Sequence, residues 1–232
     1  MNKKTALMVV HQPRSSTGDV GIKLRKRGYS LDVRRPVIGE KLPENMDEHD
    51  LAVIYGGPPS ANDDLDYIKY EIDWISKALE SNKPFLGICL GAQMLAKNLG
   101  GSVQKSHDLT LEIGFFDINP TGDGHKMFQS QKKFFQWHRE GFTVPKSCEI
   151  LANGDLFREQ AFRYKNALAI QFHPEVNLKM HLRWLYYAGY MLKEKGAQNR
   201  REQLTHRLKH GKKINLWLDS FLDNYLLKDI NS

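Results

Sequence analysis

The chain has few cysteines and no long apolar run. Its 232 residues include only 2 cysteines, Cys89 and Cys148, which is too few for a small secreted domain built on disulfides. They do not form a C-x-x-C pair of the kind that binds zinc, so we expect no metal site. No stretch reaches roughly 18 apolar residues, and residues 1–10 lack the length and the cleavage site of a signal peptide. These absences favour a cytoplasmic protein without a membrane partner.

The charge is unbalanced, because 34 Lys and Arg residues against 27 Asp and Glu residues give a formal net charge of +7. Such an excess occurs in nucleic-acid-binding proteins. Many of the basic residues lie between positions 193 and 213, a segment without the interleaved aromatic residues or the motifs of nucleic-acid-binding domains. We interpret it as a solvated basic stretch, and nucleic-acid binding through this tail is the less favoured alternative.

Strand-like and helix-like segments alternate through the first hundred residues. Apolar runs predict strands at 5–10, 51–55 and 84–88, and a further strand is expected at 30–34. Helical periodicity predicts helices at 18–27, 66–81 and 90–99. The alternation predicts an α/β fold with a doubly wound, mostly parallel sheet and helices on both faces. Ligands of such sheets bind at the carboxyl ends of the strands.

The second half shows a different pattern and a separate tail. Shorter strand-like runs, several of which we expect to pair antiparallel, lie at 111–118, 133–137, 149–152, 161–164 and 167–172, and a helix is expected at 176–192. We expect a first domain at 1–192 and an extension at 193–232, made of a flexible basic linker and a final helix. Leu218, Phe221, Leu222 and Tyr225 recur at helical spacing. We expect this apolar stripe to pack on the core of its own chain.

Cys89 is the candidate nucleophile. It lies at the centre of Gly87-Ile88-Cys89-Leu90-Gly91, between a predicted strand and a predicted helix, which is the form of a nucleophile elbow. A turn this sharp leaves no room for side chains at the two flanking positions. The dipole of the following helix favours the thiolate form of the cysteine. The alternative is a buried packing cysteine, which is how we interpret Cys148.

His173 and Glu175 are candidates for the general base and its orienting carboxylate. They flank Pro174 at the end of an apolar strand, and residues two apart in an extended segment project to the same side. A carboxylate bound to one imidazole nitrogen fixes the tautomer and leaves the other nitrogen free for proton transfer. The alternative is a His and a Glu in a surface loop.

Together these segments resemble the class I, or triad, glutamine amidotransferases. The resemblance rests on three motifs in the order found in that family, Ile54-Tyr55-Gly56-Gly57-Pro58, Pro84-Phe85-Leu86-Gly87-Ile88-Cys89-Leu90-Gly91-Ala92-Gln93 and Gln171-Phe172-His173-Pro174-Glu175. It covers residues 5–190 and is strongest for free-standing members similar to the amidotransferase part of GMP synthase. It implies a flavodoxin-like three-layer fold and hydrolysis of the glutamine side-chain amide, through a cysteine thioester and without a cofactor. The second proline of Gly-Gly-Pro-Pro is a departure that affects the entrance of the site.

The resemblance also implies roles for further residues. The backbone N–H groups of Gly57 and Leu90 would form the oxyanion hole. Gln93 and the segment Trp137-His138-Arg139-Glu140 would contact the substrate. His138 is the competing candidate for the base, and we rank it below His173 because we expect it to lack a paired carboxylate two residues on.

The destination of the ammonia is left open. The chain has no ATP-pyrophosphatase loop and no Walker A loop, so a separate synthetase subunit, such as a GMP synthase-type partner, would use the ammonia. The alternative is a stand-alone hydrolase of γ-glutamyl peptides, because plant γ-glutamyl peptidases resemble the same group.

Overall fold

The structure, a computed structural model, describes residues 4–228. The ends of the two expected domains, residues 1–3 and 229–232, lie outside the described part. The described strands are β1 Thr5–Val9, β2 Ser30–Arg34, β3 Leu51–Ile54, β4 Phe85–Ile88, β5 Ser102–Lys105, β6 Glu112–Asp117, β7 Asn119–Pro120, β8 Lys133–His138, β9 Glu140–Thr143, β10 Glu149–Asn153, β11 Glu159–Tyr164 and β12 Ala167–Ile170. The α-helices are α1 Gly18–Lys26, α2 Asp66–Glu80, α3 Leu90–Asn98, α4 Gly124–Met127, α5 Leu178–Tyr187 and α6 Arg200–Phe221. Three short helical turns are η1 Pro36–Ile38, η2 Gly189–Lys193 and η3 Leu222–Leu226.

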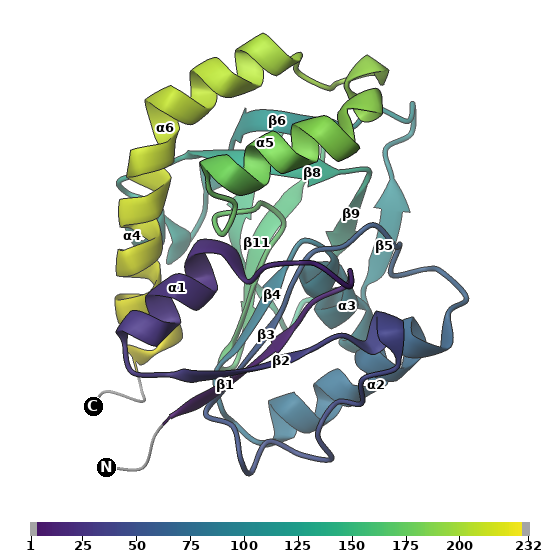
Figure 1. Ribbon diagram of the computed structural model, residues 1–232, viewed down its shortest axis with the longest axis vertical. Coiled ribbons are helices and arrows are strands. Elements are labelled where there is room, and N and C mark those ends of the chain that lie inside the picture. Colours follow the sequence, from purple (N-terminus) through teal and green to yellow (C-terminus); the bar gives the residue numbers. More distant parts are fainter. Residues whose placement is uncertain (1–3, 229–232) are drawn as a thin grey trace.

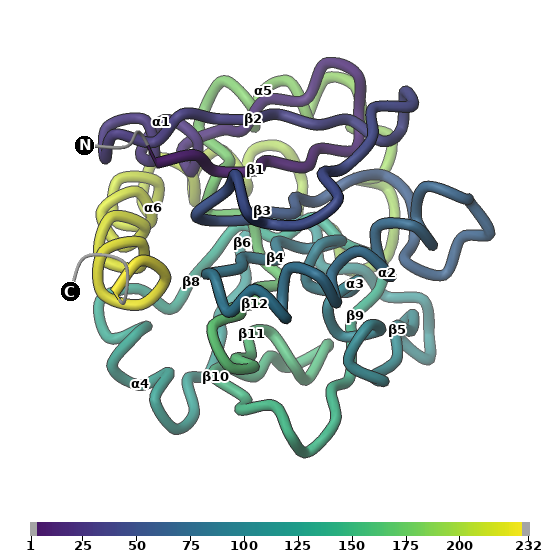
Figure 2. Tube along the Cα trace, turned by 90° about the horizontal axis from the view of Figure 1, so that it is seen from below, coloured from purple at the N-terminus to yellow at the C-terminus, as the bar shows by residue number. Residues whose placement is uncertain are grey.

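The main sheet is parallel in one half and antiparallel in the other. Its strands follow the order β2-β1-β3-β4-β12-β11-β10-β7, and Figure 2 shows the succession from β2 to β10. Pairing is parallel from β2 to β12 and antiparallel from β12 to β7. The pair β5–β9 joins this sheet through β11, whereas β6 and β8 form a separate antiparallel pair. This arrangement confirms the expected fold class.

The central strands are buried on both faces. In β1, Ala6 and Met8 contribute to one core and Leu7 and Val9 to the other. Successive residues of a strand face opposite sides of the sheet, so a strand covered on both faces consists almost wholly of apolar residues. The first core includes residues of α1 and α6, and the second includes residues of α2 and α3. Figure 1 shows these two pairs of helices on opposite sides of the sheet.

Most of the expected elements are present with ends shifted by a few residues, but the pair β5–β9 was not expected. Its strands read Ser-Val-Gln-Lys and Glu-Gly-Phe-Thr. Short strands with mostly polar residues give no clear apolar alternation. Only their pairing with each other makes them strands.

The expectation of a flexible linker at 193–213 is wrong for most of that segment. Helix α6 begins at Arg200, where Asn199 and Glu202 form a capping box, and it continues as one helix to Phe221. The cap satisfies free N–H groups of the first turn. The basic residues that suggested a linker are therefore residues of a long helix.

The apolar stripe of the C-terminal helix packs on the core of its own chain, as expected. Trp217, Leu218 and Phe221 are each at most 2% exposed. The Trp217 indole donates a hydrogen bond to the Met127 carbonyl, 2.8 Å away, and its ring lies 5.9 Å from that of Phe172. The helix thus supports the strand end that precedes His173.

Candidate active site

Cys89 forms the sharp turn between β4 and α3. Its backbone has φ 51° and ψ −105°, a left-handed value of φ that L-residues rarely adopt. A Cβ at Gly87 would lie 2.7 Å from the Gly91 carbonyl oxygen, and a Cβ at Gly91 would lie 2.1 Å from the carbonyl oxygen of Ile54. Both flanking positions therefore require glycine, which is the steric reason that the sequence pattern indicated.

His173 and Glu175 form a buried pair just beyond β12. The Nδ1 atom of His173 lies 2.8 Å from Oε1 of Glu175, and both side chains are 3% exposed. The carboxylate accepts the hydrogen on Nδ1. The other ring nitrogen, Nε2, is buried and has no hydrogen-bond partner among the described residues. The backbone N–H of His173 donates to the Phe135 carbonyl at 2.8 Å. Hydrogen bonds of both the side chain and the main chain therefore hold His173 in place.

The electrostatics of this pocket favour a protonated imidazole. Burial lowers the pKa of His173, but the negative charges of Glu175 and Cys89 outweigh it and raise the pKa to about 10. An imidazolium next to a sulfur atom is the charge partner that a thiolate requires. The pocket therefore favours the charged form of His173 near neutral pH.

Helix α1 holds Glu175 from the other side. The backbone N–H of Asp19, in the first turn of α1, donates to the Glu175 carbonyl at 2.8 Å. A Cβ at Gly18 would lie 2.3 Å from that carbonyl oxygen, so a side chain there would displace the helix. No local pattern in the sequence predicts this contact, because the two segments are far apart in the chain.

The loop after β3 lies against Cys89, the expected nucleophile. A Cβ at Gly56 would lie 2.6 Å from Cε1 of His173 and 3.2 Å from Cβ of Cys89. A Cβ at Gly57 would lie 2.4 Å from Cβ of His11. The bare backbone of this loop therefore passes between the His173–Cys89 pair and His11. Sequence reasoning missed His11, although it follows β1 at the carboxyl edge of the sheet, where ligands bind.

The two residues expected to donate to the oxyanion lie at the cavity. Gly57 and Leu90 line the same cavity as Cys89. Leu90 is the first residue of α3, so its N–H has no acceptor within the helix.

The expected substrate-contacting residues lie at one wall of the site. Gln93 donates from Nε2 to the Glu140 carbonyl at 2.9 Å, and this Nε2 also lies 3.3 Å from Oε1 of Gln171. Arg139 donates to the Pro58 carbonyl at 3.1 Å. Trp137 lines the cavity together with His138, Arg139 and Glu140. The structure thus brings all four residues of this segment together with Gln93.

His138 has a carboxylate partner that the sequence did not predict, although this partner does not come from two residues on. Its Nε2 lies 3.0 Å from Oε2 of Glu112 on the neighbouring strand and 3.2 Å from Oε1 of Gln136. Its Nδ1 lies 3.0 Å from the main-chain oxygen of Glu140, the residue two positions on. Cross-strand pairing of β6 and β8 creates the contact with Glu112, so local sequence could not reveal it. Both ring nitrogens face oxygen acceptors, whereas His173 keeps one nitrogen free.

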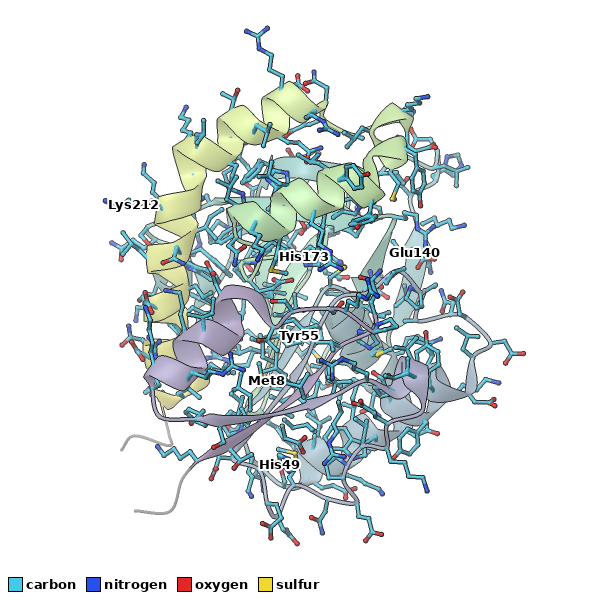
Figure 3. The ribbon with its side chains drawn as sticks, viewed as in Figure 1. Met8, His49, Tyr55, Glu140, His173 and Lys212 are labelled. Atoms are coloured by element: carbon cyan, nitrogen blue, oxygen red, sulfur yellow. The ribbon has the colours of Figure 1, made fainter. Side chains whose placement is uncertain are left out.

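Cys89, His173 and Glu175 line one cavity of about 650 Å³ together with the expected oxyanion and substrate residues. Figure 3 shows His173 near the middle of the molecule, below α5, with Glu140 to its right and Tyr55 beneath it. The outer wall adds residues that the sequence did not suggest, Arg14, Arg183, Trp184, Tyr187 and Tyr190. Within residues 4–228, no group of three or more His, Cys, Asp or Glu side chains could hold a metal ion. The same part of the chain contains no helix that meets both the length and the apolarity needed to cross a membrane.

Comparisons with known proteins agree with this architecture. The family model of class-I glutamine amidotransferases matches residues 17–188. A glutamine amidotransferase-like protein of Salmonella typhimurium is 30% identical over 182 residues, which cover 74% of this chain and 75% of the relative. The crystal structure of a glutamine amidotransferase from Thermotoga maritima superposes with a TM-score of 0.87 at 29% identity, covering 97% of this chain and 99% of the other.

Two further relatives have more specific names. One of the subunits of the glutamine-hydrolysing GMP synthase from Sulfurisphaera tokodaii is 32% identical over 142 residues, which cover 59% of this chain and 73% of the relative. Gamma-glutamyl peptidase 4 of Arabidopsis thaliana is 31% identical over 164 residues, which cover 66% of this chain and 65% of the relative. The family match spans most of the chain, and the protein is therefore an enzyme of the class I glutamine amidotransferase family.

Proposed function

We propose that this protein hydrolyses the side-chain amide of glutamine with Cys89, His173 and Glu175 and releases ammonia. The supporting observation is the free Nε2 of His173, whose other ring nitrogen is bound to Glu175 at 2.8 Å, beside a cysteine on a strained elbow. These residues lie in the unit 1–192 that we assign to amidotransferase chemistry, with 193–232 as an extension. A reducing cytoplasm would keep the thiol active.

The first half-reaction forms a thioester. The Cys89 thiolate attacks the amide carbon, a new S–C bond forms, and the carbonyl electrons move to oxygen. The N–H groups of Gly57 and Leu90 would stabilise this oxyanion, and one such donor contributes about 10²–10³-fold to kcat. The imidazolium of His173 gives its proton to the nitrogen as the C–N bond breaks, so ammonia leaves and a γ-glutamyl thioester remains.

The second half-reaction regenerates the enzyme. Neutral His173 takes a proton from water, whose oxygen attacks the thioester carbon. The C–S bond then breaks, which releases glutamate and returns the thiolate–imidazolium pair. Glu175 stabilises the charged imidazole in both halves. A separate synthetase would consume the ammonia, as the name of the GMP synthase relative suggests.

Ammonia release from L-glutamine tests the proposal. The purified protein should produce equimolar glutamate and ammonia, and mass spectrometry should detect a γ-glutamyl adduct on Cys89. The matched control is Cys148→Ala, because Cys148 lies outside the cavity. Absence of a Cys89-dependent release from glutamine and from γ-glutamyl amides would refute the proposal.

The size of the cavity favours a second candidate, a γ-glutamyl compound with a larger leaving group. Its volume of about 650 Å³ lies within the range of about 300–1,000 Å³ that is typical of pockets for drug-sized ligands. The outer wall offers Arg183 and the rings of Trp184 and Tyr187. A γ-glutamyl peptide would place its second residue there, with its carboxylate near the guanidinium, whereas glutamine would leave this wall empty.

A single variant separates the two substrates. Arg183→Gln should raise KM for γ-glutamyl dipeptides and leave KM for glutamine unchanged. Arg201→Gln is the control, because Arg201 is exposed on α6 and does not line the cavity. Equal effects of Arg183→Gln on both substrates would exclude a specific contact with the leaving group.

A further inference from the structure

A second buried His–Glu pair lies beneath the glycine loop. Nε2 of His11 lies 2.8 Å from Oε2 of Glu71, and both side chains are 0% exposed. Nδ1 of His11 lies 3.3 Å from the Gly56 carbonyl oxygen. A carbonyl oxygen can only accept, so this contact is a hydrogen bond in the forms of His11 that carry a hydrogen on Nδ1. His11 therefore links helix α2 to the loop that passes beside Cys89.

Packing alone does not account for this pair. The buried face of α2 otherwise carries the apolar residues Ile68, Trp74, Ile75 and Ala78. Oε1 of Glu71 is buried without a hydrogen-bond partner in the described part of the chain. Burying ionisable groups costs desolvation energy, and apolar replacements of buried pairs are often neutral or stabilising. The pair therefore contributes little to the stability of the fold. Its position beside the glycine loop points to a role in the candidate active site.

The geometry of one peptide bond supplies that role. A trans peptide is planar, so the Gly56 C=O and the Gly57 N–H point in opposite directions. With the carbonyl turned toward His11, the N–H is turned away from His11, and a Cβ at Gly56 would lie 2.6 Å from Cε1 of His173 and 3.2 Å from Cβ of Cys89. This N–H donates to no main-chain oxygen in residues 4–228. Two glycines in succession also leave this peptide free to rotate unless something holds it.

We propose that His11, held in place by Glu71, is a positioning residue that fixes the Gly56–Gly57 peptide with its N–H directed at the oxyanion. The inference rests on the proposed function, because that function assigns the oxyanion hole to Gly57. His11 does not touch the substrate. It acts through the backbone of the loop, and Gly57 needs to be glycine partly because His11 lies directly behind it.

Two reactions of Cys89 separate oxyanion stabilisation from thiolate reactivity. With p-nitrophenyl acetate, an S–C bond forms, the carbonyl electrons move to oxygen, and p-nitrophenolate leaves as the tetrahedral intermediate collapses. With iodoacetamide, the S–C bond forms as the C–I bond breaks, iodide leaves, and no oxyanion arises. Neither reagent needs the glutamine pocket, so the ratio of the two rates tests His11 even if the enzyme does not use glutamine. Site-resolved mass spectrometry with Cys89→Ala as background gives both rates.

His11→Phe keeps a ring but removes the donor, and His11→Asn keeps an N–H donor close to the position of Nδ1. We expect His11→Phe to lower the acetylation rate about 10- to 100-fold, within the limit set by loss of one oxyanion donor, with an unchanged alkylation rate. His11→Asn should lose much less. If His11→Phe does not yield folded protein, Glu71→Leu should show the same selective loss, because it removes the carboxyl group that holds Nε2.

Three results would overturn the inference. One is acetylation of His11→Phe, or of Glu71→Leu in its place, at the wild-type rate. Another is an equal loss of acetylation and alkylation, which would indicate a general disturbance around Cys89. The third is His11→Asn as slow in acetylation as His11→Phe, which would show that the donor has no part in the effect. Failure of the proposed function would instead appear as wild-type protein that reacts with both reagents but releases nothing from glutamine or γ-glutamyl amides.

Discussion

The packing of helix α6 can be tested with two identical substitutions on the same helix. Leu218 is 0% exposed and contributes to the core shared with the sheet, whereas Leu208 is 81% exposed. Leu→Ala removes the same atoms and changes helix propensity by the same amount at both positions. Any difference between the two variants therefore measures burial against the rest of the protein.

The expected difference is large. Leu→Ala in a packed core costs about 2–5 kcal/mol, from the lost transfer free energy and the cavity left behind. A surface substitution changes the free energy of unfolding by at most about 0.5 kcal/mol. Leu218→Ala should therefore lower the free energy of unfolding by about 2–5 kcal/mol, while Leu208→Ala leaves it nearly unchanged.

Urea unfolding followed by circular dichroism measures both variants. The midpoint should fall for Leu218→Ala at an unchanged slope, since the slope reports the surface exposed on unfolding. The same shift is expected over a wide range of protein concentrations, because the helix packs on its own chain and not on a second copy. Equal midpoints for the two variants would refute the packing of α6, and a shift that depends on concentration would indicate docking between chains.

Three further predictions concern the site. Cys89→Ala should abolish glutaminase activity and keep the fold, while Cys148→Ala should keep most activity; near wild-type turnover of Cys89→Ala in an ammonia assay would contradict the assignment. His173→Ala should lower kcat by about 10²–10⁴-fold or more. Glu175→Gln should lower kcat less, because Glu175 only orients the imidazole. A larger loss of kcat in His138→Ala would assign the role of base to His138. The folded-state pKa of His173 is raised to about 10, so its contribution to stability is fully present below its ordinary value of about 6.5 and is lost as the pH rises toward 10. The stability difference between wild type and His173→Gln should therefore shrink over that pH range in urea titrations, and a constant difference would contradict the raised pKa.

The sequence was sufficient to predict those features that depend on contacts between residues close together in the chain. The elbow needs glycine on both sides of Cys89 because the turn brings backbone atoms together within a few residues. His173 and Glu175 meet because residues two apart in an extended segment share a side. The parallel half of the sheet was predictable because most of its strands are apolar runs separated by helix-like segments.

Contacts between distant segments were decided only by the tertiary structure. His138 has its carboxylate partner because strand pairing places Glu112 beside it, and His11 meets Glu71 because the carboxyl end of β1 lies next to α2. Neither pair has a signature in sequence spacing.

The extent of α6 and the residues of the outer wall of the cavity could also not be predicted from the sequence. The charges at 193–213 suggested a linker, because basic residues occur both in solvated coil and on the exposed face of a helix. The capping box at Asn199 and the packing of Trp217 and Leu218 make most of that segment a helix. The sequence thus determined the residues of the proposed reactive centre, whose geometry arises from neighbouring residues, whereas the fold decided what supports that centre and which side chains line the cavity around it.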